Sequence, residues 1–262
     1  MPRLGIIGGS GLYDISGLTI KECKEIATPF GGPSDVYRIG EFSGVEVVFL
    51  QRHGTPHHIS PHKINYRANI WGFKELGVER IISISAAGGI SSVMEPSSVV
   101  VLDQIIDMTK GRPSTFYDSN EVLHIDFTEP YCRELRETIF TAAEKAEVGI
   151  KRSGTYICVE GPRLETAAEI KVFSMLGADV VGMTGMPEAS LAREVEICLA
   201  GIAVVTNYAA GIITGKKLTT MEVLETMKAT TEKLKSILKE VFTLIPSDRT
   251  CACKDALKEA RM

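Results

Sequence analysis

The sequence predicts a single domain of the α/β class, in which a largely parallel sheet is layered with helices. Short apolar runs of β type recur along the 262 residues, and amphipathic helical patterns alternate with them. Several runs are near-continuous in Ile and Val, which is typical of strands buried on both faces. Hydrophobic residues make up 44% of the chain, enough for a sizeable core, and we find no internal repeat or linker that would divide it.

Seven runs are expected to form strands because they are short, apolar and rich in β-branched residues. In chain order they are Leu4–Gly8, Val45–Leu50, Arg80–Ala86, Ser98–Asp103, Thr155–Glu160, Asp179–Met183 and Ile202–Thr206.

Helical patterns lie between these runs. Thr128 is expected to cap one helix, and Pro187 to open another. The longest pattern runs from Thr219 to about Phe242 and carries one apolar stripe. Only the tail after Ser247 is expected to be peripheral, so we expect one domain over residues 1–247 and a tail over residues 248–262.

Charge and hydropathy exclude several classes of partner. The net charge is −4, and nothing in the chain is basic enough to indicate a nucleic-acid surface. The N-terminus enters an apolar strand without a basic region or cleavage pattern, and no apolar run approaches membrane-spanning length. We therefore expect a cytoplasmic protein with no membrane or nucleic-acid partner.

Cysteine use gives no metal site. Four of the six cysteines are scattered, and two of these, Cys158 and Cys198, lie inside apolar runs, which favours core packing. Cys251 and Cys253 form a pair in the polar tail, but two thiolates alone do not make a zinc site. That pair is either a labile disulfide or two free thiols.

A glycine-rich turn follows the first predicted strand, with the sequence GIIGGSG from Gly5 to Gly11. Glycines let backbone N–H groups close on an anion, and Ser10 adds a hydroxyl donor. The spacing does not match the dinucleotide fingerprint, and no convincing helix follows at residues 13–17. An anion-binding loop and a simple tight turn are both consistent with this segment.

A histidine-rich segment follows the strand that ends at Leu50. Four of the five histidines lie within ten residues, beside Arg52. Arg52 and His53 suit a tetrahedral oxyanion, because a guanidinium offers a bidentate fork. A zinc site is the alternative, but no nearby Asp, Glu or Cys completes it. A polar loop with solvated histidines is a second alternative.

Further polar segments follow other predicted strands. They are Ser85–Gly89, Glu160–Glu169, Gly182–Glu188 and the stretch from Asn207 to Gly211. Each could be an ordinary strand-to-loop turn. Ligands in open α/β sheets bind outside the carboxyl ends of strands, so their agreement in position favours one shared site.

Together these segments resemble the trimeric nucleoside phosphorylases, in the branch that includes methylthioadenosine phosphorylase. The resemblance runs from about Leu4 to Leu244, and its most specific parts are GIIGGSG, RHG with PHKINYRAN, DQIIDMTKGRPSTFYD, EGPRLETAAE and GMTGMPE. It implies a single-domain three-layer α/β/α fold with a mixed central sheet. Thermophilic members form a disulfide from tail cysteines like Cys251 and Cys253.

The resemblance also implies the site residues. The phosphate site would comprise Ser10, Arg52, His53, Ser85, Ala86 and Thr184. The nucleoside site would comprise Met183, Leu164, Glu165, Asn207, Ala209 and Thr220. His124 would enter a neighbouring subunit's site near the 5′ end of the nucleoside, so a homotrimer or a dimer of trimers is expected.

Two positions depart from the adenine-specific pattern. Methylthioadenosine phosphorylases carry two aspartates where this chain has Asn207 and Ala209. An amide supplies a donor for O6 and an acceptor for N7–H of a 6-oxopurine. In the relatives that cleave inosine and guanosine, a glutamate at the place of Glu165 accepts from N1–H, which adenine lacks. Both positions therefore favour a 6-oxopurine substrate over an adenine nucleoside.

The 5′ end of the substrate stays open. Thr220 could bond a 5′-hydroxyl, whereas Met221, Val223 and Leu224 could accept a methylthio group. Inosine, guanosine and 5′-methylthioinosine are all candidate substrates.

The expected chemistry is phosphorolysis without metal or organic cofactor, with Asn207, Glu165 and His53 as catalytic residues. The alternatives are a methylthioadenosine phosphorylase, a nucleoside-sensing protein without turnover, and a dinucleotide-binding oxidoreductase. The glycine spacing weakens the last of these.

Overall fold

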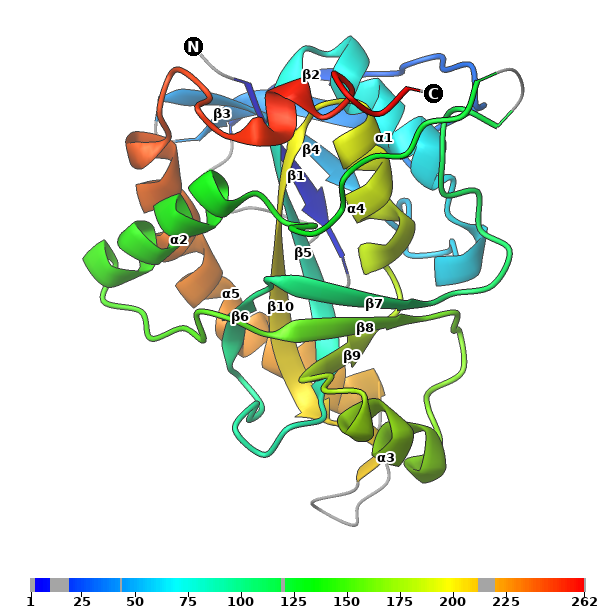
Figure 1. Cartoon of the computed structure of the whole chain (residues 1–262). Coiled ribbons are helices and arrows are strands. Elements are labelled where there is room, and N and C mark those ends of the chain that lie inside the picture. Colours follow the sequence, from blue (N-terminus) through cyan, green and yellow to red (C-terminus); the bar gives the residue numbers. More distant parts are fainter. Residues whose placement is uncertain (1–2, 10–18, 43, 119–120, 212–219, 262) are drawn as a thin grey trace.

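The structure, a computed structural model, describes residues 3–9, 19–42, 44–118, 121–211 and 220–261. Its strands are β1 (Arg3–Gly8), β2 (Thr19–Lys24), β3 (Tyr37–Phe42), β4 (Val45–Gln51), β5 (Val78–Gly89), β6 (Val99–Val101), β7 (Gln104–Met108), β8 (Thr155–Val159), β9 (Val180–Gly182) and β10 (Cys198–Tyr208). Within the described chain they form one sheet in the order β2-β3-β4-β1-β5-β9-β8-β7, with β10 pairing β5 and β6 (Figure 1).

The sheet is mixed. Its centre is parallel, because β1 runs parallel to β4 and β5, and β5 runs parallel to β10. The pairs β7–β8 and β8–β9 are also parallel. The pairs β2–β3, β3–β4, β5–β9 and β6–β10 are antiparallel. The mixed central sheet is therefore confirmed.

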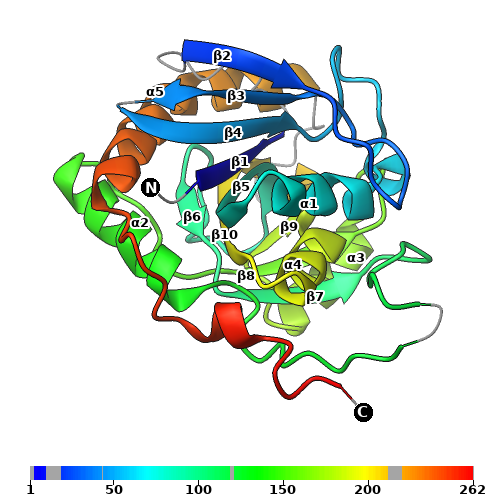
Figure 2. The same ribbon diagram turned by 90° about the horizontal axis from the view of Figure 1, so that it is seen from above.

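Helices cover both faces of the sheet. The helices are α1 (Tyr66–Glu75), α2 (Arg133–Lys145), α3 (Ala167–Met175), α4 (Gly185–Glu194) and α5 (Thr220–Leu244). Viewed from above, α2 and α5 lie on one side of the sheet and α1 and α4 on the other (Figure 2). Alternate residues of β4 serve the two layers: Val48 packs in the cluster that contains Phe73 of α1, and Val47 in the cluster that contains Leu238 of α5. The three-layer fold is confirmed.

The strands β2, β3 and β7 and the helices α1 and α3 lie outside the predicted runs. All six residues of β2 are exposed, so no apolar alternation marks that strand. Helix α1 begins with Asn65 as its N-cap, whose side chain accepts a hydrogen bond from the backbone of Ala68. Helix α3 starts with a reciprocal capping box between Thr166 and Glu169, inside the polar segment Glu160–Glu169 for which no helix is predicted.

Two predicted boundaries are wrong. Thr128 does not cap a helix, because its N–H is held by the Asp126 carboxylate at 2.9 Å and α2 begins at Arg133. The strand predicted over Ser98–Asp103 is shorter, because only Val99–Val101 pairs with β10, and the chain then enters β7 beside β8.

The tail packs on the domain. Arg80 donates to the Asp248 carbonyl at 2.9 Å, and the side chain of Cys253 is buried. The sulfur atoms of four cysteines meet there, all within 4.8 Å of one another: Cys132, Cys198, Cys251 and Cys253. The predicted core packing of Cys198 is confirmed, and its sulfur also contacts the tail.

None of the helices described is both long enough and apolar enough to cross a bilayer.

Candidate active site

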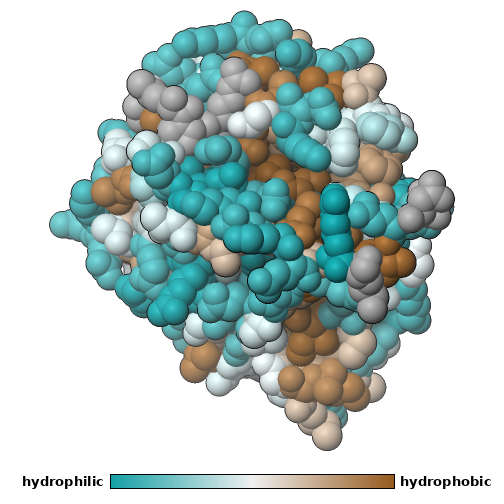
Figure 3. Space-filling view, turned by 45° about the horizontal axis from the view of Figure 1, so that its top comes forward, coloured by the Kyte–Doolittle hydropathy of each residue, from teal (hydrophilic) through white to brown (hydrophobic). Residues whose placement is uncertain are grey.

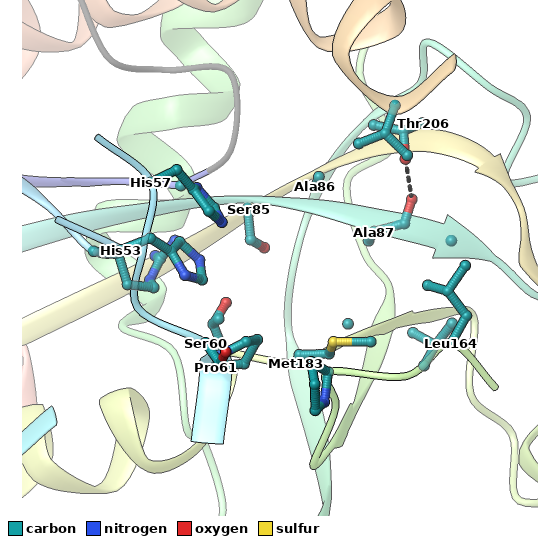
Figure 4. Close-up of a pocket in the computed structure, with 18 of the residues that line it drawn as sticks. His53, His57, Ser60, Pro61, Ser85, Ala86, Ala87, Leu164, Met183 and Thr206 are labelled. Atoms are coloured by element: carbon teal, nitrogen blue, oxygen red, sulfur yellow. Dashed lines mark hydrogen bonds between the residues drawn. The ribbon is translucent and has the colours of Figure 1, made fainter. Parts of the chain in front are cut away.

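A cavity of about 470 Å³ lies where the chain leaves β4, β5, β8, β9 and β10. The side chains of His53, His57 and Ser85 stand toward one end, and those of Met183 and Leu164 toward the other (Figure 4). The predicted site residues that line the cavity are Arg52, His53, Ser85, Ala86, Leu164, Glu165, Met183, Thr184 and Asn207. Residues from separate strand ends thus share one cavity, as the α/β topology predicts.

Of the other four predicted site residues, the structure describes the side chains of two. Ser10 and the side chain of Thr220 lie outside the described residues. Ala209 is buried behind the cavity wall, because a Cβ on the lining residue Gly88 would lie 3.2 Å from the Ala209 Cβ. His124 is exposed on the segment that pairs with the tail, where its N–H donates to the Ala260 carbonyl at 2.9 Å.

Arg52 is fully buried and bonded on three sides. Its Nε donates to Glu188 Oε1 at 2.5 Å, and its Nη2 donates to Glu188 Oε2 at 3.2 Å and to the Ser83 hydroxyl at 2.8 Å. Its Nη1 donates to the Ile84 carbonyl at 3.0 Å. Burial would lower the pKa of Arg52, but the charge and hydrogen bonds of Glu188 raise it above the usual value, so the guanidinium stays charged.

A close backbone approach lies beside this guanidinium. A Cβ at Gly9 would lie 2.7 Å from Arg52 Nη1, so only glycine fits there. The glycine-rich turn of the sequence therefore meets the arginine of the histidine-rich segment.

His53 is a neutral imidazole. Burial, followed by the charge of Arg52, lowers its pKa to about 4. Its Nδ1 lies 2.8 Å from the Ile59 carbonyl, which accepts only and so fixes the proton on Nδ1. Nε2 is then an acceptor. The ring stacks on His57 with centroids 4.2 Å apart.

The loop after β9 carries Met183 and Thr184 into the cavity. The Thr184 N–H donates to the Tyr156 hydroxyl at 3.2 Å. Met183 packs on Gly161, since a Cβ there would lie 2.5 Å from the methionine sulfur. This contact joins the loop after β9 to the loop after β8.

Arg112 lies behind those two loops and bonds both. Its guanidinium donates to the carbonyls of Met183 and Met186, each at 2.8 Å, and to the Glu160 carbonyl at 2.7 Å. It also pairs with the Glu160 carboxylate at 3.2 Å. One buried side chain therefore fixes the distance between the loop that carries Met183 and the loop that carries Glu165.

Glu165 lines the cavity from the loop after β8, and Asn207 lines it from the end of β10. Burial raises the pKa of Glu165, with Glu169 adding a smaller effect in the same direction. The Asn207 amide has one donor and one acceptor already engaged: Oδ1 accepts from the Thr206 hydroxyl at 2.8 Å, and Nδ2 donates to the Tyr208 carbonyl at 3.1 Å. One N–H and one lone pair remain for a ligand.

Helix α5 contributes an apolar group to the lining. Val223 lines the cavity, whereas Met221 and Leu224 are exposed. Of the three apolar residues expected to meet a 5′ substituent, Val223 thus lies at the cavity.

Sequence reasoning missed the residues that hold the site from behind. Glu188 and Arg112 stood inside segments used for the resemblance, but they received no role because the partner of each lies far away along the chain. Ser83 was hidden inside an apolar strand run. The only signal in the sequence was that each charged residue lies in a segment that follows a strand.

The four tail-contact cysteines could hold a metal, because four thiolates can form a tetrahedral set that suits zinc. They could also oxidise in pairs. Cys198 and Asn207 stand nine residues apart on β10, or about 30 Å at the usual rise per residue, so this cluster is remote from the cavity.

Comparisons with known proteins agree on the family. A family model described as the phosphorylase superfamily matches residues 3–243. The chain is 52% identical to the 6-oxopurine nucleoside phosphorylase of Pyrococcus furiosus over 99% of both chains. It is also 52% identical to a probable S-methyl-5′-thioinosine phosphorylase of Thermodesulfovibrio yellowstonii, over 98% of this chain and 97% of the other. A solved methylthioadenosine phosphorylase from Schistosoma mansoni, in complex with adenine, superimposes with a TM-score of 0.95 at 32% identity, over 100% of this chain and 99% of the other.

Proposed function

The chain belongs to the phosphorylase superfamily, and from this premise we propose that it cleaves 6-oxopurine nucleosides with inorganic phosphate. The products are a free purine base and a pentose 1-phosphate. Inosine and guanosine are the proposed substrates.

Phosphate would bind at the end of the cavity formed by Arg52, His53, Ser85 and Thr184. The neutral His53 presents Nε2 as an acceptor, which suits a protonated phosphate oxygen. An unprotonated oxygen of the bound phosphate then attacks C1′, the C1′–N9 bond breaks, and the purine leaves with the electron pair and takes up one proton from solvent at N7. Positioning and charge stabilisation supply the catalysis, and the protein provides no covalent nucleophile.

The base would bind between Glu165 and Asn207. Asn207 offers one free N–H for O6 and one free lone pair for the proton at N7 of the departing purine. The Glu165 carboxylate accepts from N1–H. The free N–H of Asn207 is the observation that carries the assignment. In a 6-aminopurine the amino group is a donor, so it would face this N–H where O6 would accept from it.

The test is a base-release assay with inosine, guanosine, adenosine, methylthioadenosine and methylthioinosine, each with and without phosphate. Hypoxanthine and guanine should form only when phosphate is present, and chelator should not change the rate. Faster release of adenine would refute the base assignment, and release without phosphate would make the protein a hydrolase.

S-methyl-5′-thioinosine is the second candidate substrate. Val223 gives the lining an apolar group from α5, and the T. yellowstonii relative bears the name of that activity. A lower KM for methylthioinosine than for inosine would favour this candidate over the first.

The proposed assembly is a homotrimer or a dimer of trimers, acting in the cytoplasm. The end of α3 supports association because Val172, Met175 and the following Leu176 expose large apolar side chains there. Figure 3 shows apolar atoms gathered at the lower end of the molecule, over α3. Sedimentation equilibrium would test the assembly, and a monomer would contradict a role for His124 in a neighbouring site.

A further inference from the structure

The hydrogen-bonding capacity of Arg52 is almost fully used inside the protein. A guanidinium has five N–H donors. Glu188 takes the Nε–H and shares Nη2 with Ser83, and the Ile84 carbonyl takes one N–H of Nη1. One N–H of Nη1 remains, and Nη1 is the atom that lies beside Gly9 on the cavity wall. The direction of that last donor depends on how the rest of the group is held.

Glu188 connects three elements by hydrogen bonds at the end of the cavity proposed to bind phosphate, which we call the phosphate end. It lies near the start of α4, four residues after Thr184, and its side chain is 1% exposed. Its Oε2 also accepts from the Ser83 hydroxyl at 2.7 Å, so Ser83 of β5 donates to Glu188 and accepts from Arg52 in one closed network. The network thereby connects the end of β4, the strand β5 and the start of α4.

We propose that Glu188 is the positioning residue for phosphate, because its carboxylate fixes the Arg52 guanidinium so that a single Nη1–H is aimed into the cavity. This inference rests on the proposed function. Glu188 itself does not line the cavity, so it acts through Arg52 rather than on the substrate.

A buried ion pair could instead serve only to neutralise charge. In that case the loss of the Glu188 charge would leave Arg52 uncompensated, and phosphate would bind more tightly. Positioning predicts the opposite, because a guanidinium without its bidentate partner no longer holds the Nη1–H in place. The sign of the change in phosphate affinity therefore separates the two roles.

The experiment compares Glu188→Gln and Glu188→Asp with the wild-type protein. Gln keeps the shape but offers one acceptor in place of two, and Asp keeps the charge on a shorter arm. At saturating inosine, the KM for phosphate should rise about tenfold or more in Glu188→Gln, with a smaller rise in Glu188→Asp. The KM for inosine should stay within about twofold in both. Ser83→Ala should shift the phosphate KM in the same direction by less.

Glu194→Gln is the matched control. Glu194 is a second buried glutamate on α4, and its carboxylate accepts from the Phe116 N–H at 2.7 Å, remote from Arg52. Gln retains an acceptor for that bond, so the phosphate KM should not change. A general loss of α4 packing would affect both glutamine variants alike and would overturn the proposal.

Phosphate binding is also measured without turnover, as the rise in Tm that phosphate produces in each variant. A phosphate KM and Tm rise equal to wild type in both Glu188 variants overturns the inference, and so does tighter binding in Glu188→Gln. If Glu188→Gln does not fold, Glu188→Asp and Ser83→Ala decide by the same two readouts. A wild-type protein that releases base without phosphate refutes the proposed function instead.

Discussion

Replacement of Asn207 by Asp should change which base the protein accepts. The amide has one N–H and one lone pair left for a ligand after its bonds to Thr206 and Tyr208. Aspartate is acceptor-only, so the donor to O6 is lost and a carboxylate oxygen faces that atom. A second carboxylate oxygen stands where Nδ2 now donates to the Tyr208 carbonyl at 3.1 Å.

The size of the effect follows from these contacts. Loss of the donor to O6, together with the repulsion between O6 and the carboxylate oxygen that faces it, costs about 3 kcal/mol of transition-state stabilisation. At about 1.4 kcal/mol per decade, kcat/KM for inosine should fall about a hundredfold. Adenosine should gain less, about tenfold, because the Glu165 carboxylate still faces an N1 that carries no proton. The double variant with Glu165→Gln should favour adenosine outright.

The assay is kcat/KM for inosine and adenosine at saturating phosphate, measured on the wild type, Asn207→Asp, the double variant and Asn207→Ala. Alanine removes both bonds to the base, so it should lower activity without inverting the preference. A folded Asn207→Asp whose inosine kcat/KM lies within about threefold of wild type would refute the role of Asn207 in base selection.

Three further outcomes are expected. Because burial raises the pKa of Glu165, and because its ionised form is the acceptor for N1–H, kcat/KM for inosine should be full above that raised pKa and fall as pH drops through it. A pH profile of Glu165→Gln should lack this acid limb, and an unchanged limb would assign it to another group. Arg112→Lys should raise the inosine KM about tenfold and leave the phosphate KM within about twofold, since lysine cannot keep the bonds to both loops; equal changes in both constants would contradict this division. Serine at both Cys251 and Cys253 should lower Tm by about 2–8 °C in calorimetry, because the tail loses its contact with the domain. An unchanged Tm would show that these cysteines do not anchor the tail.

The positions of the central strands, and of the polar segments that follow them, could be predicted from the sequence for a physical reason. Central strands buried on both faces must be apolar throughout, so β1, β4, β5 and β10 stood out as Ile- and Val-rich runs. The edge strand β2 has no buried face and so left no pattern. Because parallel strands end at a common edge, the polar segments after them could be expected to share one cavity.

Partners across the fold could not be predicted in the same way. Nothing in the local sequence relates Arg52 to Glu188, which lies 136 residues further along the chain. The position of Ala209 behind Gly88 likewise depends on how the end of β10 packs against β5. Such pairs follow from strand order and register, which the amino-acid pattern of a single segment does not determine.

The two buried arginines explain how the proposed reaction, which uses no covalent nucleophile, could have a precisely held site. Removing two charges from water costs free energy that their attraction often fails to recover, so a pair with 0% and 1% exposed side chains is a poor way to stabilise a fold. The pair of Arg52 and Glu188 is better explained by a role in fixing the direction of one N–H at the proposed phosphate end of the cavity. Arg112 has the corresponding place at the nucleoside end, where it sets the separation of two loops. If Arg52 and Arg112 are each held rigidly by their hydrogen bonds inside the protein, the proposed reaction requires little more than the correct approach of phosphate and nucleoside within the cavity.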